Sequence, residues 1–267
     1  MFWTVTLSIL QGCSQAVKLF FLTLLFALPL GLVVAFGSMS KWAPFRALAY
    51  RQQEARGFAR WLSQLRPLSA LTNVIVWIIR GTPLILQLII IFYGPGTWFG
   101  TNPWNAFRDG RMTACCIAFI INYACYFSVI YRGGIQAVDP GQMEGAKAIG
   151  MTHMQAMFHV ILPQTLRNLV PQIGNHFIIN LKDSSMLSVI SVTELFFSFK
   201  SAAAAVYLYF PAAFLAMLLY LIMTLVSARL LRVWERSLSG AENYELTGDP
   251  FSLDASGAGP NDKEATV

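Results

Sequence analysis

Long uncharged apolar runs are the dominant pattern of the sequence. Residues 19–37 and 112–131 are runs of 19 and 20 residues without a charge, and each is long enough as a helix to cross a hydrocarbon core about 30 Å thick. Residues 71–93 are equally apolar except for one arginine. Residues 201–228 are uncharged but contain Pro211, which places the start of that helix near the proline.

A further apolar stretch is repeatedly interrupted by polar or helix-bending residues, namely Asn168, Pro171, Gln172, Gly174, Asn175, His176 and Asn180. Lipid does not tolerate such a helix face, because unpaired polar groups in hydrocarbon are costly. We therefore expect this helix to lie inside a bundle or along a water-filled path. Together the runs predict an all-α, polytopic membrane helical bundle with about five transmembrane helices, at residues 17–37, 71–93, 112–131, 166–182 and 207–230.

Composition and charge agree with a membrane protein. The chain is 56% hydrophobic and 12% charged, whereas soluble domains are roughly 25% charged. Residues 40–70 carry six basic residues against one acidic residue, and basic residues also follow the last span. The positive-inside rule then puts the N-terminus outside and the C-terminus in the cytoplasm. In this interpretation residues 1–238 are the transmembrane domain, and the acidic residues 239–267 are expected to be disordered.

The cytoplasmic segment 139–163 carries helix-boundary signals. Asp139 offers an N-cap, followed by a proline at the first helical position and a glutamine, Gln142, at the capping-box position. Gly150 would end this helix in a left-handed conformation. A second capping box, from threonine to the glutamine three positions later, would open another helix that Pro163 limits. We expect an elbow of two short helices that meet at Gly150.

The second helix of the elbow carries an apolar stripe at helical spacing, formed by Met154, Met157, Phe158 and Ile161. A stripe that faces the cytosol needs a partner. One interpretation is that it folds back onto the chain's own membrane helices. The other is that it presses into a groove on a cytosolic subunit, and the residues alone leave both open.

Residues 144–163 resemble the EAA loop of bacterial importer permeases. The positions that match are Glu144, Ala146, Gly150, Leu162 and Pro163, while Gly145 replaces an alanine and Val160 an isoleucine. In that family the loop is the coupling helix, which docks on an ATP-hydrolysing subunit. The resemblance therefore implies a set of ATPase-docking residues: Glu144, Gly145, Ala146, Gly150, Leu162 and Pro163.

Residues 80–88, 132–136 and 180–195 are similar to stretches of the polar amino-acid uptake permeases of bacterial ABC importers. The resemblance covers about residues 71–236 and implies the type I ABC importer permease fold in the bacterial inner membrane. It also implies the partners: two ATP-binding cassette ATPase subunits that use ATP and Mg, a second permease that is identical or paralogous, an extracytoplasmic substrate-binding protein and an amino-acid substrate.

Charged residues at membrane depth are candidates for the translocation path. Arg80 lies about ten residues into the second span, where an unpaired charge costs several kcal/mol, and the next residues break the helix. Either Arg80 is held by a structural ion pair or a helix terminus, or the broken turn lines the path. The adjacent Lys182 and Asp183 leave a similar choice between a self-satisfied pair and an outer gate. The candidate path residues are Arg80, Gly81, Thr82, Pro83, Gln87, Lys182, Asp183, Ser184, Ser185 and Glu194.

The sequence argues against an enzyme with its own nucleotide site. Residues 145–152 have the glycine spacing of a phosphate loop but carry Met151 where a lysine is required. The three histidines lack metal-ligand spacing, so we predict no catalytic residue, metal or cofactor on this chain. The basic segment 41–66, which has aromatic residues among its charges, is expected to lie at the lipid interface and not on nucleic acid.

The leading hypothesis is the transport subunit of an ATP-driven importer, which moves a polar amino acid or a close relative into the cytoplasm by alternating access. Its energy would come from a separate ATPase docked at residues 139–163. The alternative is an ion-gradient-driven carrier or channel that needs no ATPase subunit, although five spans without a visible repeat differ from common carriers. A co-purifying ATPase would favour the first, and transport by the isolated chain the second.

Overall fold

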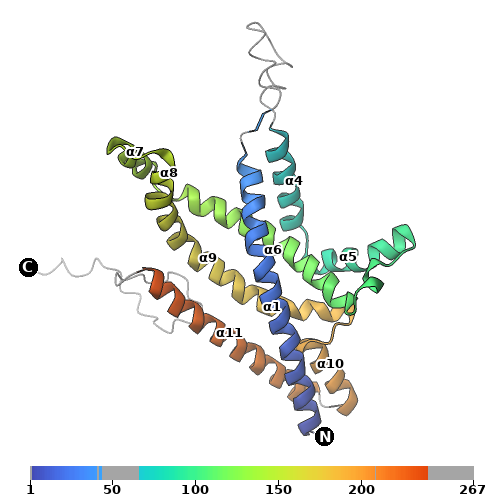
Figure 1. The fold of residues 1–267 in the computed structure, drawn as a ribbon. Coiled ribbons are helices and arrows are strands. Elements are labelled where there is room, and N and C mark those ends of the chain that lie inside the picture. Colours follow the sequence, from blue (N-terminus) through green and yellow to red (C-terminus); the bar gives the residue numbers. More distant parts are fainter. Residues whose placement is uncertain (1, 41, 44–65, 208, 240–267) are drawn as a thin grey trace, which may run out of the picture.

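The computed structural model describes residues 2–40, 42–43, 66–207 and 209–239, and every regular element in these ranges is helical (Figure 1). The longer helices are α1 (Phe2–Met39), α4 (Pro67–Gly81), α5 (Leu84–Phe99), α6 (Gly110–Gln136), α9 (Leu162–Asp183), α10 (Leu195–Val206) and α11 (Tyr209–Ser239). The shorter ones are the 3-10 helices η1 (Pro103–Ala106) and η3 (Ser184–Ile190), the α-helices α7 (Pro140–Ala148) and α8 (His153–Ala156), and the π-helix η2 (Met157–Ile161).

Helix α6 is the centre of the bundle, because α1, α4, α5 and α9 all pack against it. Its buried Phe119 and Phe127 share one apolar core with Leu19 of α1 and with Leu169 of α9. The two helices are in close contact where α6 crosses α9, since a Cβ atom on Gly134 would require the side chain of Leu169 to shift. This packing makes α6 the wall against which the candidate path residues of the other helices are positioned.

The expected number of membrane spans depends on how bent helices are counted. In the described ranges, three helices are each long and apolar enough to cross a membrane: Ile9–Met39, Gly110–Gln136 and Tyr209–Glu235. Two bent pairs raise the number to as many as five if each pair is one span: α4 with α5, bent by 106°, and His153–Ile190 with Leu195–Ala205, bent by 53°. The segment 71–93 is therefore not a single continuous helix.

The two ends of the bundle carry different elements. The elbow of α7 and α8 lies toward the same end as the C-terminal end of α11, whereas the N-terminal end of α1 lies with α10 toward the opposite end (Figure 1). Two segments with sequence-based expectations, the basic segment 41–66 and the acidic tail 239–267, lie almost entirely outside the described residues.

Helix α7 begins and ends at the residues that the sequence predicts. The Asp139 carboxylate accepts a hydrogen bond from the backbone N–H of Gly141, 2.8 Å away, and a proline follows Asp139 in the first turn. Gly150 has a left-handed φ of 85°. The backbone N–H groups of Gly150 and Met151 donate to two carbonyls in the last turn of α7. This is the Schellman arrangement, so the chain reverses at Gly150 without leaving those carbonyls unpaired.

The second helix of the elbow starts with the predicted capping box. Thr152 Oγ1 accepts a hydrogen bond from the Gln155 N–H, and Gln155 Oε1 accepts one from the Thr152 N–H, 2.9 Å away. The expected capping role of Gln142 was wrong, because its side chain accepts a hydrogen bond from the amide of Gln164 instead. That contact ties the start of α7 to the first turns of α9.

The expectation that Pro163 ends the second elbow helix was also wrong. Helix α8 runs through the π-helix η2 into α9, whose first turn contains Pro163. In this wide turn the Leu162 N–H donates to the carbonyl of Met157, five residues earlier. A proline lacks an N–H and crowds the preceding turn, and the wider π turn accommodates it without a break. The second elbow helix and the fourth span are thus one continuous rod.

Helix α10 occupies a region that the sequence placed in a loop outside the membrane. Glu194 caps it: its two carboxylate oxygens accept hydrogen bonds from the N–H groups of Phe196 and Phe197, each at 2.7 Å. The Tyr220 hydroxyl of α11 donates to the same carboxylate at 3.0 Å. A Cβ atom on Gly12 of α1 would lie 2.7 Å from the Glu194 carbonyl carbon, so this junction also requires a glycine.

Gln87 holds the break between α4 and α5. Its Nε2 atom donates to the carbonyls of Ile79 (2.7 Å) and Thr82 (3.1 Å), which the break leaves without helical partners. Its Oε1 atom accepts a hydrogen bond of 2.9 Å from Asn122 of α6. One side chain therefore satisfies the interrupted backbone and fixes it to the central helix.

We predict that Gln87→Leu destabilises the protein by about 1–3 kcal/mol, because the two carbonyls and the Asn122 amide lose their buried partner. The melting temperature of the purified permease in detergent would report this loss. Gln172→Leu is the matched control, since Gln172 is exposed and makes only a 3.4 Å contact with a carbonyl in its own helix. Equal melting temperatures for the two variants would contradict the assigned role of Gln87.

The two glycines of the elbow should respond in opposite directions to alanine. Gly145 lies inside α7 with open space where a Cβ atom would be, so Gly145→Ala should stabilise α7 by about 0.5–1 kcal/mol. Gly150→Ala should destabilise its end by a similar amount, because alanine disfavours the left-handed conformation. Hydrogen exchange of the α7 amides should become slower in the first variant and faster in the second. The same direction of change in both would contradict the capping geometry.

Candidate functional site

A polar cavity of about 430 Å³ lies between the α4–α5 break and the facing surfaces of α6 and α9. Its lining combines charged, aromatic and amide side chains with the backbone of the break: Arg80, Gly81, Thr82, Pro83, Leu84, Asn122, Tyr123, Tyr126, His176, Ile179 and Asp183. The broken helix brings its own terminus to the cavity wall. The site therefore exists because the second span is interrupted at membrane depth.

Arg80 supplies the positive charge of the cavity. It is in the last turn of α4, where the carbonyl ends of the helix favour a cation. Its guanidinium carbon lies over the Tyr126 ring, 5.1 Å from the ring centroid, and such a cation–π contact holds the group in place without occupying its N–H donors. Arg80 is also exposed, so it can meet an anionic group in the cavity.

Asp183 supplies the negative charge, at the last residue of α9. The Tyr123 hydroxyl of α6 donates a hydrogen bond of 2.7 Å to Asp183 Oδ2. Asp183 is partly buried and borders the cavity. Because a carboxylate has more acceptor positions than this bond uses, it can receive a further donor from a ligand.

The wall between these charges is aromatic. The His176 ring of α9 lies 5.2 Å from the Tyr126 ring and 6.4 Å from the Tyr123 ring, measured between centroids. Tyr126 therefore contacts both Arg80 and His176. A small cavity with one cation, one carboxylate and an aromatic wall suits a small zwitterion, which needs a partner for each of its charges.

The predicted path residues have different places in the structure. Arg80, Gly81, Thr82, Pro83 and Asp183 line the cavity, and Gln87 lies behind it as the clamp of the break. Lys182 is exposed and does not border the cavity, whereas Ser184 is buried and Ser185 half-buried.

The expectation that the Glu194 carboxylate is available to a ligand was wrong. Glu194 is completely buried, and the cap of α10 together with the Tyr220 hydroxyl uses both of its oxygens. A carboxylate in this position stabilises the junction between α10 and α11. Its sequence context, a single acid in an apolar stretch, did not distinguish a cap from a path residue.

Six cavity residues were missed as site residues: the apolar Leu84 and Ile179, and the polar or aromatic Asn122, Tyr123, Tyr126 and His176. The run 112–131 was judged only by its lack of charge, although Asn122 and Tyr126 are four residues apart and share a helix face. That spacing of an amide and a phenol in an apolar run was a usable signal. His176 was classed as structural because no metal-ligand pattern surrounds it.

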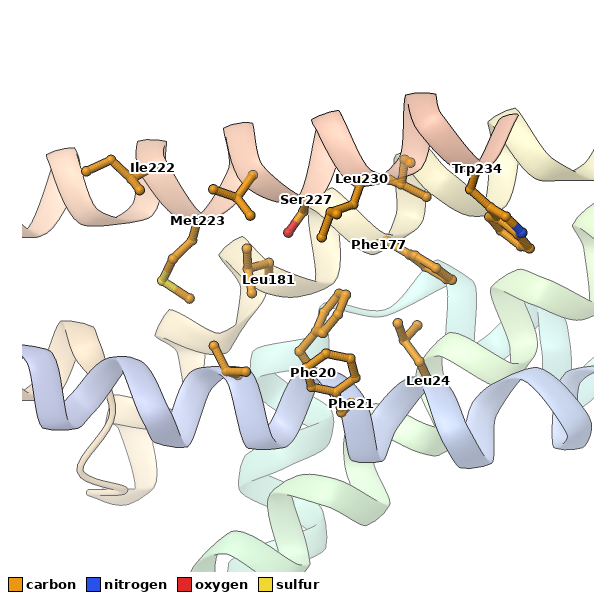
Figure 2. Close-up of a pocket in the computed structure, with 13 residues that line it drawn as sticks. Phe20, Phe21, Leu24, Phe177, Leu181, Ile222, Met223, Ser227, Leu230 and Trp234 are labelled. Carbon is orange, nitrogen blue, oxygen red and sulfur yellow. The ribbon is translucent and has the colours of Figure 1, made fainter. Parts of the chain in front are cut away.

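A second cavity, of about 500 Å³, has a different chemistry. It lies between α1, α9 and α11, where Phe20 and Phe21 face Met223 and Leu230 with Phe177 behind them (Figure 2). Ser227 is among the few polar groups on its wall. A zwitterion would leave its charges unpaired in such a site, so this cavity does not compete as an amino-acid site.

The apolar stripe of the elbow divides into two parts. Ile161 is only 6% exposed and packs into the protein, whereas Met154 and Phe158 are 60% and 57% exposed. Ile149, at the end of α7, is 76% exposed. The inner part of the stripe therefore folds back onto the chain, and the outer part, together with Ile149, forms an exposed apolar surface, which we call the elbow knob (Ile149, Met154 and Phe158).

Of the expected docking residues, Glu144, Gly145 and Gly150 are exposed, and Ala146 is buried beneath them. Leu162 and Pro163 are exposed in the first turn of α9. The docking residues and the elbow knob thus belong to the same end of the bundle (Figure 1). They are separated from the polar cavity by the length of α9.

Known proteins are similar in sequence to most of the chain. The family model for the binding-protein-dependent transport system inner membrane component matches residues 57–240. The arginine transport system permease protein ArtQ of Bacillus subtilis (strain 168) is 30% identical over 230 residues, which is 86% of this chain and 92% of that protein. The L-cystine transport system permease protein TcyB of the same strain is 39% identical over 170 residues, 62% of this chain and 70% of its own.

The fold is shared as well. A crystal structure of an amino acid ABC transporter with histidines superposes with a TM-score of 0.72 and 33% identity, covering 88% of this chain and 96% of that one. The structural likeness extends over most of the all-α bundle, so the structure comparison and the sequence comparisons point to the same family. The chain belongs to the binding-protein-dependent transport system inner membrane components, and within them to the permeases of amino-acid ABC transporters.

Proposed function

We propose that this chain is the membrane-spanning subunit of an ATP-driven importer that moves a polar amino acid or a close relative into the cytoplasm by alternating access. The observation that carries the proposal is the polar cavity, with Arg80 and Asp183 on its wall. Arg80 binds the carboxylate of the substrate, and Asp183 binds its ammonium group. Both contacts are charge-assisted, which makes them stronger than neutral hydrogen bonds.

The names of the relatives support this substrate class. A glutamine transport system permease protein of Escherichia coli (strain K12) is 31% identical to this chain. The compounds in the three relatives' names are arginine, L-cystine and glutamine, and all of them have an α-carboxylate and an α-ammonium group. Arg80 binds the shared carboxylate, and Asp183 binds the shared ammonium group. The side chain of the substrate then meets the aromatic wall formed by Tyr123, Tyr126 and His176.

The elbow, residues 139–163, is the proposed docking site for a separate ATPase. The elbow knob offers the apolar surface, and the Schellman turn at Gly150 fixes its orientation. The full assembly contains two ATP-binding cassette subunits, which use ATP and Mg, a second permease and an extracytoplasmic substrate-binding protein. In the proposed orientation the elbow end is in the cytoplasm and the N-terminus is outside the bacterial inner membrane, and the excess of basic residues in segment 40–70 supports it.

Neutralising either charge of the cavity should weaken substrate binding. We expect Arg80→Gln and Asp183→Asn each to raise the KM for uptake by about 10- to 100-fold, since each loses a hydrogen bond between charged groups. Uptake of labelled L-arginine, L-glutamine and L-cystine by the complete transporter in proteoliposomes measures this. Lys182→Gln is the control, because Lys182 is adjacent but outside the cavity, and its KM should stay within about twofold. A larger effect from Lys182 than from Asp183 would contradict the site.

Removing the elbow knob should separate the permease from its ATPase. The variant Met154→Ser with Phe158→Ser should reduce co-purification of the ATPase subunit with the tagged permease by about tenfold or more, because interface energy is concentrated in a few apolar anchors. Leu68→Ser is the control, since Leu68 is an exposed apolar residue outside the elbow. Normal ATPase retention by the elbow variant would exclude the docking surface, whatever the transport rate.

A further inference from the structure

Asn180 is completely buried in α9, and neither its amide nitrogen nor its carbonyl oxygen has a hydrogen-bond partner. Buried polar groups are nearly always paired, because an unpaired group loses its hydration without compensation. Asn180 is therefore the least satisfied side chain of the polar region around the cavity. An apolar residue of the same size would avoid this loss of hydration energy. The presence of an amide therefore suggests another state of the protein, in which the amide forms a hydrogen bond.

Tyr123 is the neighbour that can serve as a hydrogen-bond partner for Asn180. The side-chain amide group of Asn180 lies near the Tyr123 hydroxyl oxygen, but the two groups do not form a hydrogen bond. That hydroxyl instead donates to Asp183 Oδ2 at 2.7 Å. Asn180 and Asp183 are three residues apart on α9, so they share one helix face toward Tyr123. A rotation about the C–O bond of Tyr123, together with a turn of the Asn180 amide that presents its carbonyl oxygen, changes the acceptor without moving the ring.

The charge of Asp183 decides which acceptor is preferred. In the empty cavity the carboxylate is the stronger acceptor, because hydrogen bonds to ionised groups are stronger than those to amides. An ammonium group at Asp183 neutralises that charge and removes much of the advantage. The Tyr123 hydroxyl can then donate its hydrogen bond to the Asn180 carbonyl oxygen instead. This change of acceptor is favoured because it gives a buried, unpaired carbonyl oxygen a partner.

We propose that Asn180 is a positioning residue that receives the Tyr123 hydroxyl when the ammonium group of an amino acid binds Asp183. The inference rests on the proposed function, because it assumes an amino acid in the cavity. Asn180 does not touch the substrate. It gives the ammonium group one more acceptor position on Asp183, and so favours ligands with a primary ammonium over N-acylated analogues of the same size.

A double-mutant cycle tests this exchange in the complete transporter in proteoliposomes, with labelled L-arginine, L-glutamine and L-cystine as probes. Asn180→Leu should raise the KM by about fivefold, the loss of one hydrogen bond available only in the bound state, with kcat little changed and an equal or higher melting temperature. In the Tyr123→Phe background the same change should have no further effect, because no hydroxyl is left to transfer. Asn180→Val provides a second replacement if the leucine variant does not assemble.

Three results would overturn the proposal. One is an unchanged KM in both Asn180 variants, and another is an effect of equal size in both Tyr123 backgrounds, which would indicate that Asn180 merely holds a buried water molecule. The third is an N-acetylated amino acid that competes as well against the wild type as the free amino acid does. If the wild-type transporter moves none of the three probes, the proposed function fails instead, and the two failures are therefore distinguishable.

Discussion

The backbone break at Gly81–Pro83 is the constraint on which the rest of the structure depends. In a bilayer no water is available to pair the carbonyls that a broken helix exposes, so irregular backbone persists only where protein satisfies it. The Gln87 side chain does this from α5, and Asn122 of α6 fixes Gln87 in turn. Without that arrangement Arg80 would lie in the middle of a continuous apolar helix, and the cavity would have no positive wall.

Helix α9 connects the two regions that the proposed function requires. Its N-terminal end continues from the elbow through η2, and its C-terminal end carries Asp183 at the cavity. Under the proposed function, this continuous rod would carry a movement of the elbow to Asp183, whereas Arg80 belongs to α4. Access to the cavity and the distance between its two charges would then depend on the position of one helix.

The features that the sequence predicted well are those set by local chemistry. The caps at Asp139, Gly150 and Thr152 depend on residues at most five positions apart, and each of these residues caps a helix as predicted, although Gln142 does not take part. The polar fourth segment packs against α6 and α11 and buries Asn180, as its composition led us to expect, but Gln172 and Asn175 are exposed. Arg80 and Pro83 were recognisable as a charge and a break at membrane depth, although the bend of 106° was not.

The features that the sequence did not predict depend on long-range packing. Tyr123 and His176 become site residues only because α6 and α9 cross with the right faces together. Glu194 is the opposite case, because it was predicted as a path residue but caps α10. The short alanine-rich stretch between the fourth and fifth expected spans did not predict that helix. The predicted helix end at Pro163 was wrong for a related reason, because a helix tolerates a proline where a π turn precedes it.

That π turn at Met157–Ile161 also has an evolutionary meaning. A π-helical turn contains one residue more than the α-helix needs to cover the same length, and each residue of an α-helix advances the chain by about 100° of rotation. Loss of a single residue there would restore a regular α-helix and leave the elbow knob and the cavity in nearly the same angular register, because the π turn takes up its extra residue within one wider turn. The length of the rod can therefore change by one codon without reorienting its two ends.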